Sequence, residues 1–105
     1  MNILSNIQSI YFVGIGGMGM SALARFAIKK NLAVFGYDKT QTVLTATLEK
    51  EGAVITFEDS MSSLPPKVKN NTSTLVVYTP AIPEDNKILQ WFTGQDYRVI
   101  KRAEF

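Results

Sequence analysis

Short apolar runs alternate along this chain with segments of helical periodicity. Each run is rich in β-branched and aromatic residues and ends at a turn-forming residue, which is typical of strands buried on both faces. The pattern predicts five strands, at residues 9–14, 33–37, 54–57, 75–78 and 97–100. Because parallel neighbours need a crossover connection, strands that alternate with helices predict a parallel sheet.

Helices are predicted in three of the intervening segments. The first helix is predicted at 18–30, with an apolar face of Ala22, Leu23, Phe26 and Ala27. The second is predicted at 43–51, with Leu44 and Leu48, and the third at 83–94, with Ile88, Leu89 and Phe92. The proline- and asparagine-rich stretch 60–74 predicts at most one helical turn. Right-handed crossovers then give an α/β fold, a Rossmann-like doubly wound sheet of about five parallel strands with helices on both faces. The 105 residues suffice for one such domain, 1–105.

The composition excludes several kinds of chemistry. The chain has no Cys and no His, which excludes disulfides, thiolate nucleophiles, Cys/His zinc sites and imidazole catalysis. Eleven Lys and Arg against nine Asp and Glu, without a basic stripe, argue against a nucleic-acid partner. No apolar run approaches the roughly 18 residues of a membrane span, and the start lacks a signal-peptide pattern. We therefore expect a cytoplasmic protein without a membrane partner.

A glycine-rich segment, GIGGMGMS at residues 14–21, lies between a predicted strand and a predicted helix. We call it the glycine loop. In that context Gly14, Gly16 and Gly19 match the dinucleotide fingerprint. Gly14 allows a tight turn, Gly16 allows close approach of a phosphate, and Gly19 allows the helix to pack closely on the strand. Unpaired N–H groups and the positive end of the helix dipole are expected to face a diphosphate. The alternative is that these glycines serve only the packing of strand against helix.

The same eight residues have the spacing of a nucleoside-triphosphate loop that ends in a hydroxyl, at Ser21. That loop needs a lysine at the position of Met20 to reach the β- and γ-phosphates. Methionine carries no charge, so the sequence predicts binding of a diphosphate here without hydrolysis or transfer of ATP.

Two further segments are candidates for the same site. Asp38 ends the second predicted strand, near the spacing at which an acidic residue accepts hydrogen bonds from a ribose, with Lys39 beside it. Thr79, Pro80 and Ala81 follow the fourth strand, at the edge where doubly wound sheets bind ligands. Asp38 can instead cap local N–H groups, Lys39 can be a solvated charge, and residues 79–82 can be an ordinary turn. Trp91 and Phe92 are better explained by core packing or an interface than by stacking on a ligand.

At this point the sequence resembles the N-terminal domain of the Mur ligases, in the branch that acts on UDP-N-acetylmuramate and L-alanine. The resemblance covers residues 11–105. It is carried by GIGGMGMS at 14–21, YDKTQTVLTATLEKEGA at 37–53, TPAIPEDN at 79–86 and KRAEF at 101–105.

The resemblance implies an ATP-dependent, ADP-forming ligase of bacterial peptidoglycan synthesis with three domains. This chain would be the domain that binds UDP-N-acetylmuramate, and by itself inactive. ATP, magnesium and L-alanine would be bound by a central ATPase domain and a C-terminal domain, so no cofactor, metal ligand or catalytic residue is expected here.

The family's substrate-binding residues carry over to particular positions of this sequence. They are Gly14, Ile15, Gly16, Gly17, Met18, Gly19, Met20, Ser21, Asp38, Lys39, Thr79, Pro80 and Ala81. Thr45 and Leu48 match a threonine and a leucine of the following helix. The chain departs from the pattern at Tyr37, at Thr79–Pro80 in place of two serines, and at Asp59 where the family often has histidine.

Two other functions remain open from the residues alone. The glycine loop with Asp38 also fits an NAD(P)-binding domain of an oxidoreductase or redox sensor. A non-catalytic interaction module in which the loop is only structural is the second alternative.

Overall fold

The computed structural model describes residues 4–17, 19–69 and 72–105. Its strands are β1 (Ser9–Val13), β2 (Ala33–Tyr37), β3 (Val54–Thr56), β4 (Thr74–Tyr78) and β5 (Arg98–Lys101). Its α-helices are α1 (Met20–Lys29), α2 (Val43–Glu51) and α3 (Lys87–Gly94), and its short 3₁₀ helices are η1 (Met61–Ser63), η2 (Pro66–Lys69) and η3 (Arg102–Glu104). None of the helices in the described part of the chain has the length and apolar character that a membrane crossing requires.

The five strands form one parallel sheet in the order β3-β2-β1-β4-β5. The chain builds outward from β1 to β3, then crosses the sheet and builds outward again through β4 and β5. This order confirms the predicted doubly wound fold. The winding direction changes between β1 and β4, and the carboxyl ends of the strands at that point are where such sheets bind ligands.

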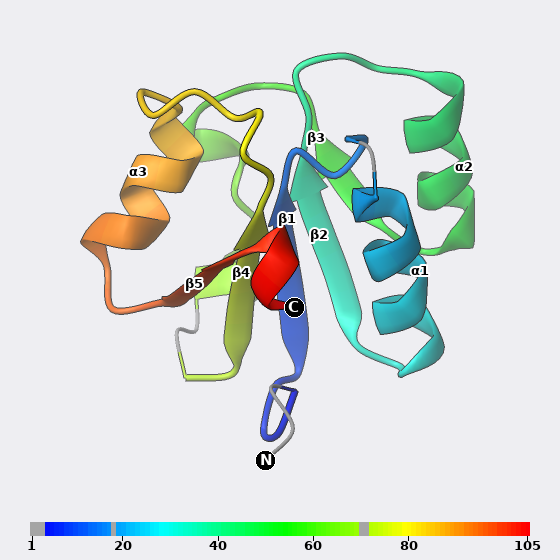
Figure 1. Ribbon diagram of the computed structural model, residues 1–105, viewed down its shortest axis with the longest axis horizontal. Coiled ribbons are helices and arrows are strands. Elements are labelled where there is room, and N and C mark those ends of the chain that lie inside the picture. Colours follow the sequence, from blue (N-terminus) through cyan, green and yellow to red (C-terminus); the bar gives the residue numbers. More distant parts are fainter. Residues whose placement is uncertain (1–3, 18, 70–71) are drawn as a thin grey trace.

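Helices cover both faces of the sheet (Figure 1). On one face α1 and α2 pack against side chains of β1, β2 and β4, with Phe12, Ala24 and Leu48 fully buried. On the other face α3 and the connection through η1 and η2 pack against Tyr11, with Phe92 buried among them. The ring centroids of Tyr11 and Phe92 are 5.0 Å apart and those of Trp91 and Phe92 are 5.2 Å apart, which confirms core packing of this aromatic pair.

The apolar face predicted for the first helix is partly wrong. The helix begins at Met20, and its buried residues are Met20, Ala24 and Ala27, which share one stripe at spacings of four and three. Ala22 is exposed and Phe26 is 43% exposed, because both lie outside this buried stripe of the helix. Packing of α1 against the sheet therefore determines which of its residues face the core.

Two predictions about the connections are also wrong. The stretch 60–74 holds two 3₁₀ turns and not one at most, because the buried side chains of Leu64 and Val68 attach it to the sheet. The last helix begins at Lys87 and not at Pro83, because the Asn86 side chain accepts a hydrogen bond from Leu89 N (2.8 Å) and caps the helix there. Residues 83–85 consequently form a turn before α3.

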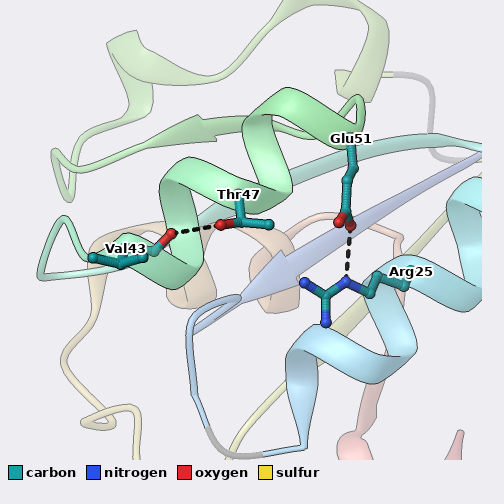
Figure 2. Close-up of polar contacts among 4 residues, drawn as sticks. All are labelled: Arg25, Val43, Thr47 and Glu51. Carbon is teal, nitrogen blue, oxygen red and sulfur yellow. Dashed lines mark hydrogen bonds and ion pairs between the residues drawn. The ribbon is translucent and has the colours of Figure 1, made fainter.

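Polar contacts connect α1 to α2 at the surface (Figure 2). Arg25 Nε donates to Glu51 Oε1 at 2.8 Å, and both side chains are more than a third exposed. Within α2, Thr47 Oγ1 donates to the carbonyl oxygen of Val43 (2.9 Å). An ion pair this exposed contributes at most about 1 kcal/mol, so burial of Leu48 holds α2 in place more than this pair does.

Candidate functional site

A cavity of about 450 Å³ lies at the carboxyl ends of β1, β2 and β4, where the winding direction changes. Its lining residues are Gly14, Gly16, Gly17, Tyr37, Asp38, Lys39, Asp59, Thr79, Ala81, Ile82, Pro83, Asp85 and Asn86. The glycine loop, the end of β2 and the segment after β4, which are far apart in sequence, therefore form one concave site.

Gly14 allows the loops after β1 and β4 to meet. Its φ is +91°, and a methyl group on its Cα would lie 2.5 Å from Thr79 Cγ2 and 3.3 Å from two carbons of Ile82. Thr79 N donates to the carbonyl oxygen of Val13 (3.3 Å), which holds the two loops together. A side chain at this position would push the Thr79 segment out of the site.

The amides at the start of the glycine loop donate to protein acceptors. Gly14 N and Ile15 N both donate to the carbonyl oxygen of Tyr37, at 2.8 and 3.0 Å. Gly16 N donates to Asp38 Oδ2 at 2.8 Å. The prediction that unpaired N–H groups face the ligand is wrong for these three, because amides beside buried strand ends take the nearest protein acceptor.

Two further amides of the loop are also engaged. Gly17 N donates to the carbonyl oxygen of Gly14 (2.9 Å), and Met20 N to that of Gly17 (3.1 Å). These turns shape the loop and leave fewer amides to bind a diphosphate than the fingerprint alone indicates.

Asp38 occupies the centre of this network. Its Oδ2 accepts from Gly16 N and its Oδ1 accepts from Thr40 N (3.1 Å), so it does cap local amides as the alternative interpretation held. The carboxylate lines the cavity and is half-buried. Since a carboxylate has about four acceptor positions, two remain for the hydroxyl groups of a ribose.

The other predicted residues differ in where they lie. Lys39, Thr79 and Ala81 line the cavity, together with Gly14, Gly16, Gly17 and Asp38. The side chains of Ile15 and Met20 are fully buried in the core, so they reach a ligand only through their backbone atoms. Gly19, Ser21 and Pro80 do not line the cavity, and Met18 lies outside the described residues.

Sequence reasoning missed Pro83, Asp85 and Asn86, which line the cavity from the turn before α3. The sequence pattern places Pro83 and Asp85 in the first turn of a helix, because Pro, Glu and Asp favour that position. The available signal was Asn86, a strong N-cap residue with a helical apolar pattern directly after it.

Asp59 and Thr45 both have structural roles. Asp59 lines the cavity and accepts from Lys87 N (3.0 Å) and Ile88 N (2.9 Å), so its carboxylate attaches the loop before η1 to the start of α3. Thr45 is fully buried, and it forms reciprocal hydrogen bonds with Thr42 that begin α2. Asp59 therefore fixes a wall of the cavity, and Thr45 fixes the start of α2.

Two tyrosines lie near these acids. Burial raises the pKa of Tyr11, and the charge of Asp59 adds to the effect. The pKa of Tyr37 is raised by burial first, then by Asp59 and Asp38. Both phenols are therefore neutral near pH 7, and Tyr37 can donate a hydrogen bond in the cavity. Tyr11 Oη is buried without a hydrogen-bond partner in the described part of the chain.

The charges in the cavity favour some parts of a nucleotide over others. Asp38, Asp59 and Asp85 carry negative charge, and Lys39 carries the single positive charge among the lining residues. Carboxylates accept hydrogen bonds from sugar hydroxyls and from the N–H groups of a base, and they repel phosphate. This cavity is therefore suited to a nucleoside, with phosphates placed outside it.

Two observations bear on the binding of a triphosphate or a metal ion at this site. With the Met20 side chain in the core, the loop presents no amine to the β- and γ-phosphates. In residues 4–17, 19–69 and 72–105 no three acidic side chains gather closely enough to hold a metal ion.

Comparison with known proteins identifies the family of this chain. The sequence profile described as "Mur ligase family, catalytic domain" matches residues 9–105. The chain belongs to the Mur ligase family. The resemblance predicted from the glycine loop and the segments that follow it is thus confirmed.

This Mur ligase chain is similar to proteins named UDP-N-acetylmuramate–L-alanine ligase. One from Christiangramia forsetii is 45% identical over 105 residues, which are 99% of this chain and 23% of that protein. One from Cytophaga hutchinsonii is 46% identical over 101 residues, 96% of this chain and 22% of that protein. The crystal structure of UDP-N-acetylmuramate-alanine ligase from Thermotoga maritima superposes with a TM-score of 0.79 at 31% identity, and the match covers 91% of this chain and 21% of that one. The chain thus spans about a fifth of the length of these relatives.

Proposed function

We propose that this Mur ligase chain binds UDP-N-acetylmuramate for a ligase that joins this nucleotide sugar to L-alanine in peptidoglycan synthesis. The observation that carries the proposal is the cavity that joins the glycine loop, Asp38 and Thr79, in a chain 45% identical to a ligase of that name. That cavity suits a nucleoside, and the glycine loop has methionine at position 20 in place of the lysine that binds a triphosphate.

Each wall of the cavity has a part in this binding. Asp38 accepts hydrogen bonds from the ribose hydroxyls, and the glycine loop leaves space for the ligand beside it. Tyr37 and Ile82 provide apolar surface for the uracil ring, and the Thr79 hydroxyl can bond to the base or the sugar. The diphosphate extends along the loop toward the start of α1.

The chemical steps belong to parts of the enzyme outside this chain. A central domain would bind ATP and magnesium and phosphorylate the carboxylate of the sugar substrate. A further domain would bind L-alanine, whose amine attacks the acyl phosphate and releases phosphate, with ADP as the other product. This chain contributes binding and no catalytic residue, and the reaction takes place in the cytoplasm, which supplies ATP.

Titration of the 105-residue chain with three ligands tests the proposal. UDP and UDP-N-acetylmuramate are expected to bind, and NADH is expected to bind more weakly or not at all. NADH is the relevant competitor because Asp38 beside Gly16 is also the arrangement that holds the ribose of a nicotinamide dinucleotide. A preference for NADH would assign the chain to dinucleotide binding instead.

Replacing Asp38 with asparagine is expected to weaken UDP binding by about 1 to 3 kcal/mol, since a hydrogen bond to a charged group is lost. Calorimetric titration of wild type and variant measures the difference. Asp96→Asn is the matched control, because Asp96 is exposed in the turn before β5. Equal UDP affinity for Asp38→Asn and wild type would remove Asp38 from the site.

A further inference from the structure

We propose that Asn86 and Asp59 select the base of the nucleotide, by pairing with a ring N–H and the carbonyl group beside it. The inference rests on the proposed function, since it assigns two residues to one part of the same ligand. Uracil presents such an edge. Cytosine does not, because its ring nitrogen at the same position is unprotonated and lies beside an amino group.

Asn86 has one polar atom that the described protein does not use. The residue lines the cavity and is 5% exposed. Its backbone N donates to the carbonyl oxygen of Pro83 (3.1 Å), and its carbonyl oxygen accepts from Gln90 N (3.0 Å). Its Oδ1 accepts from Leu89 N (2.8 Å). The side-chain nitrogen Nδ2 remains, and it carries two hydrogen-bond donors.

This nitrogen faces the cavity. Within residues 4–17, 19–69 and 72–105, Tyr11 Oη is the one enclosed side-chain polar atom that lacks a hydrogen-bond partner. Asn86 Nδ2 is therefore not enclosed by protein, and the cavity is the open space that Asn86 lines. The amide cannot turn over, because Leu89 N needs Oδ1 as its acceptor. Asn86 thus presents a fixed donor in the wall of the cavity.

An acceptor lies beside this donor. Asp59 also lines the cavity, and its Oδ2 and Oδ1 accept from Lys87 N (3.0 Å) and Ile88 N (2.9 Å). The Asp59 carboxylate and the Asn86 amide therefore bind three successive amides, those of residues 87–89, at the start of α3. A carboxylate has about four acceptor positions, so Asp59 keeps two for a ligand.

The position of the sugar determines which edge of the base meets this pair. Burial first, then the charges of Asp59 and Asp38, raise the pKa of Tyr37, so its phenol lies within electrostatic range of both acids. A nucleoside that extends from Asp38 across Tyr37 directs the far edge of its base toward Asp59 and Asn86. The N3–H of uracil then donates to Asp59, and the adjacent carbonyl accepts from Asn86. In cytosine the same ring nitrogen is an acceptor, which the Asp59 carboxylate repels.

The test compares UDP with CDP by calorimetric titration, because these nucleotides have the same size and charge and differ at this edge of the base. Wild type is expected to bind UDP roughly tenfold more tightly or better, the usual discrimination by a pair of hydrogen bonds to a base. Asn86→Ser keeps a residue type that caps helices but removes the amide. It is expected to lower the ratio of UDP to CDP affinity by roughly fivefold, the effect of one lost hydrogen bond.

Two further variants complete the comparison. Asp59→Asn is expected to lower the same ratio, because an amide at this position can donate to the ring nitrogen of cytosine. Glu84→Gln is the control, since Glu84 is exposed in the turn before α3 and does not line the cavity. Its ratio is expected to equal that of wild type.

The ratio separates base selection from a structural role, which would weaken UDP and CDP binding equally. An unchanged ratio in folded Asn86→Ser or folded Asp59→Asn would overturn the proposal, and so would wild type that binds CDP as tightly as UDP. If neither variant folds, titration of wild type with 3-methyl-UDP decides. Its methyl group replaces the N–H that Asp59 accepts, so affinity equal to that of UDP would contradict the proposal. Wild-type chain that binds neither UDP nor CDP would contradict the proposed function itself.

Discussion

Replacement of Gly36 by valine is expected to lower the free energy of unfolding by about 3 kcal/mol, the upper part of the usual range for an overpacked core. Gly36 lies in β2, and a Cβ there would be 2.7 Å from Ile15 Cδ1 and 2.8 Å from Ile15 Cβ. Ile15 is fully buried, so it has no space into which to move.

Strand propensity alone predicts the opposite sign for this substitution. Valine is among the best strand formers, and glycine weakens a strand by roughly 0.5 to 1 kcal/mol. The contact with Ile15 outweighs this gain because the core is close-packed and a displacement of Ile15 would disturb its neighbours as well.

Urea unfolding of wild type and Gly36→Val measures the effect. Gly94→Ala is the control, because a Cβ at the end of α3 meets nothing within 4 Å, and its stability is expected to be equal or slightly higher. Adding Ile15→Ala to Gly36→Val should cost less than the sum of the two single changes, since the two residues are in contact. A Gly36→Val protein as stable as wild type would show that Ile15 can repack.

Replacement of Gly16 by valine is expected to weaken UDP binding roughly a hundredfold, equivalent to about 2.7 kcal/mol. A Cβ on Gly16 would lie 2.9 Å from Asp38 Oδ2 and 3.0 Å from Thr45 Cγ2. Thr45 is fully buried and cannot yield, so the half-buried Asp38 moves. The carboxylate then loses its bond to Gly16 N and its position for the ribose, and the valine side chain occupies part of the cavity.

Calorimetric titration with UDP measures this loss, and circular dichroism establishes whether the variant is folded. The stability change is expected to be smaller, about 1 kcal/mol, because Asp38 can shift toward solvent. Gly94→Val serves as the control for a valine in place of an unconstrained glycine. Undiminished UDP affinity in a folded Gly16→Val protein would favour the interpretation of the loop as purely structural.

The fold was predictable because its signals are local and repeated. Runs such as residues 75–78 are apolar throughout, as a strand covered by helices on both faces must be, and the structure places β4 between β1 and β5. The errors concerned the start and buried face of helices and the structure of a connection. The start of α3 depends on the Asn86 cap, and the two 3₁₀ turns depend on where Leu64 and Val68 meet the sheet.

Only part of the site could be predicted from the sequence. Which residues lie together was predictable, and which of their amides are free to bind a ligand was not. Gly14, Asp38 and Thr79 follow strands, and the carboxyl ends of parallel strands meet at one edge, so their proximity follows from the topology. The topology does not predict which loop amides remain available to a ligand. Gly16 N and Ile15 N donate to acceptors on β2 and directly after it, and only folding brings these acceptors near the loop.

By itself the sequence determined the parallel doubly wound sheet and the position of the glycine loop between strand and helix. It also determined that the loop has methionine, and not lysine, at position 20. These properties depend on residue type and short-range spacing. Only the tertiary structure decided that Ile15 fills the space above Gly36, that Asp38 bonds to the loop, and that Asp59 bonds to the start of α3. Each of these joins residues at least 20 positions apart, and such contacts are set by packing of whole elements, which no local pattern encodes.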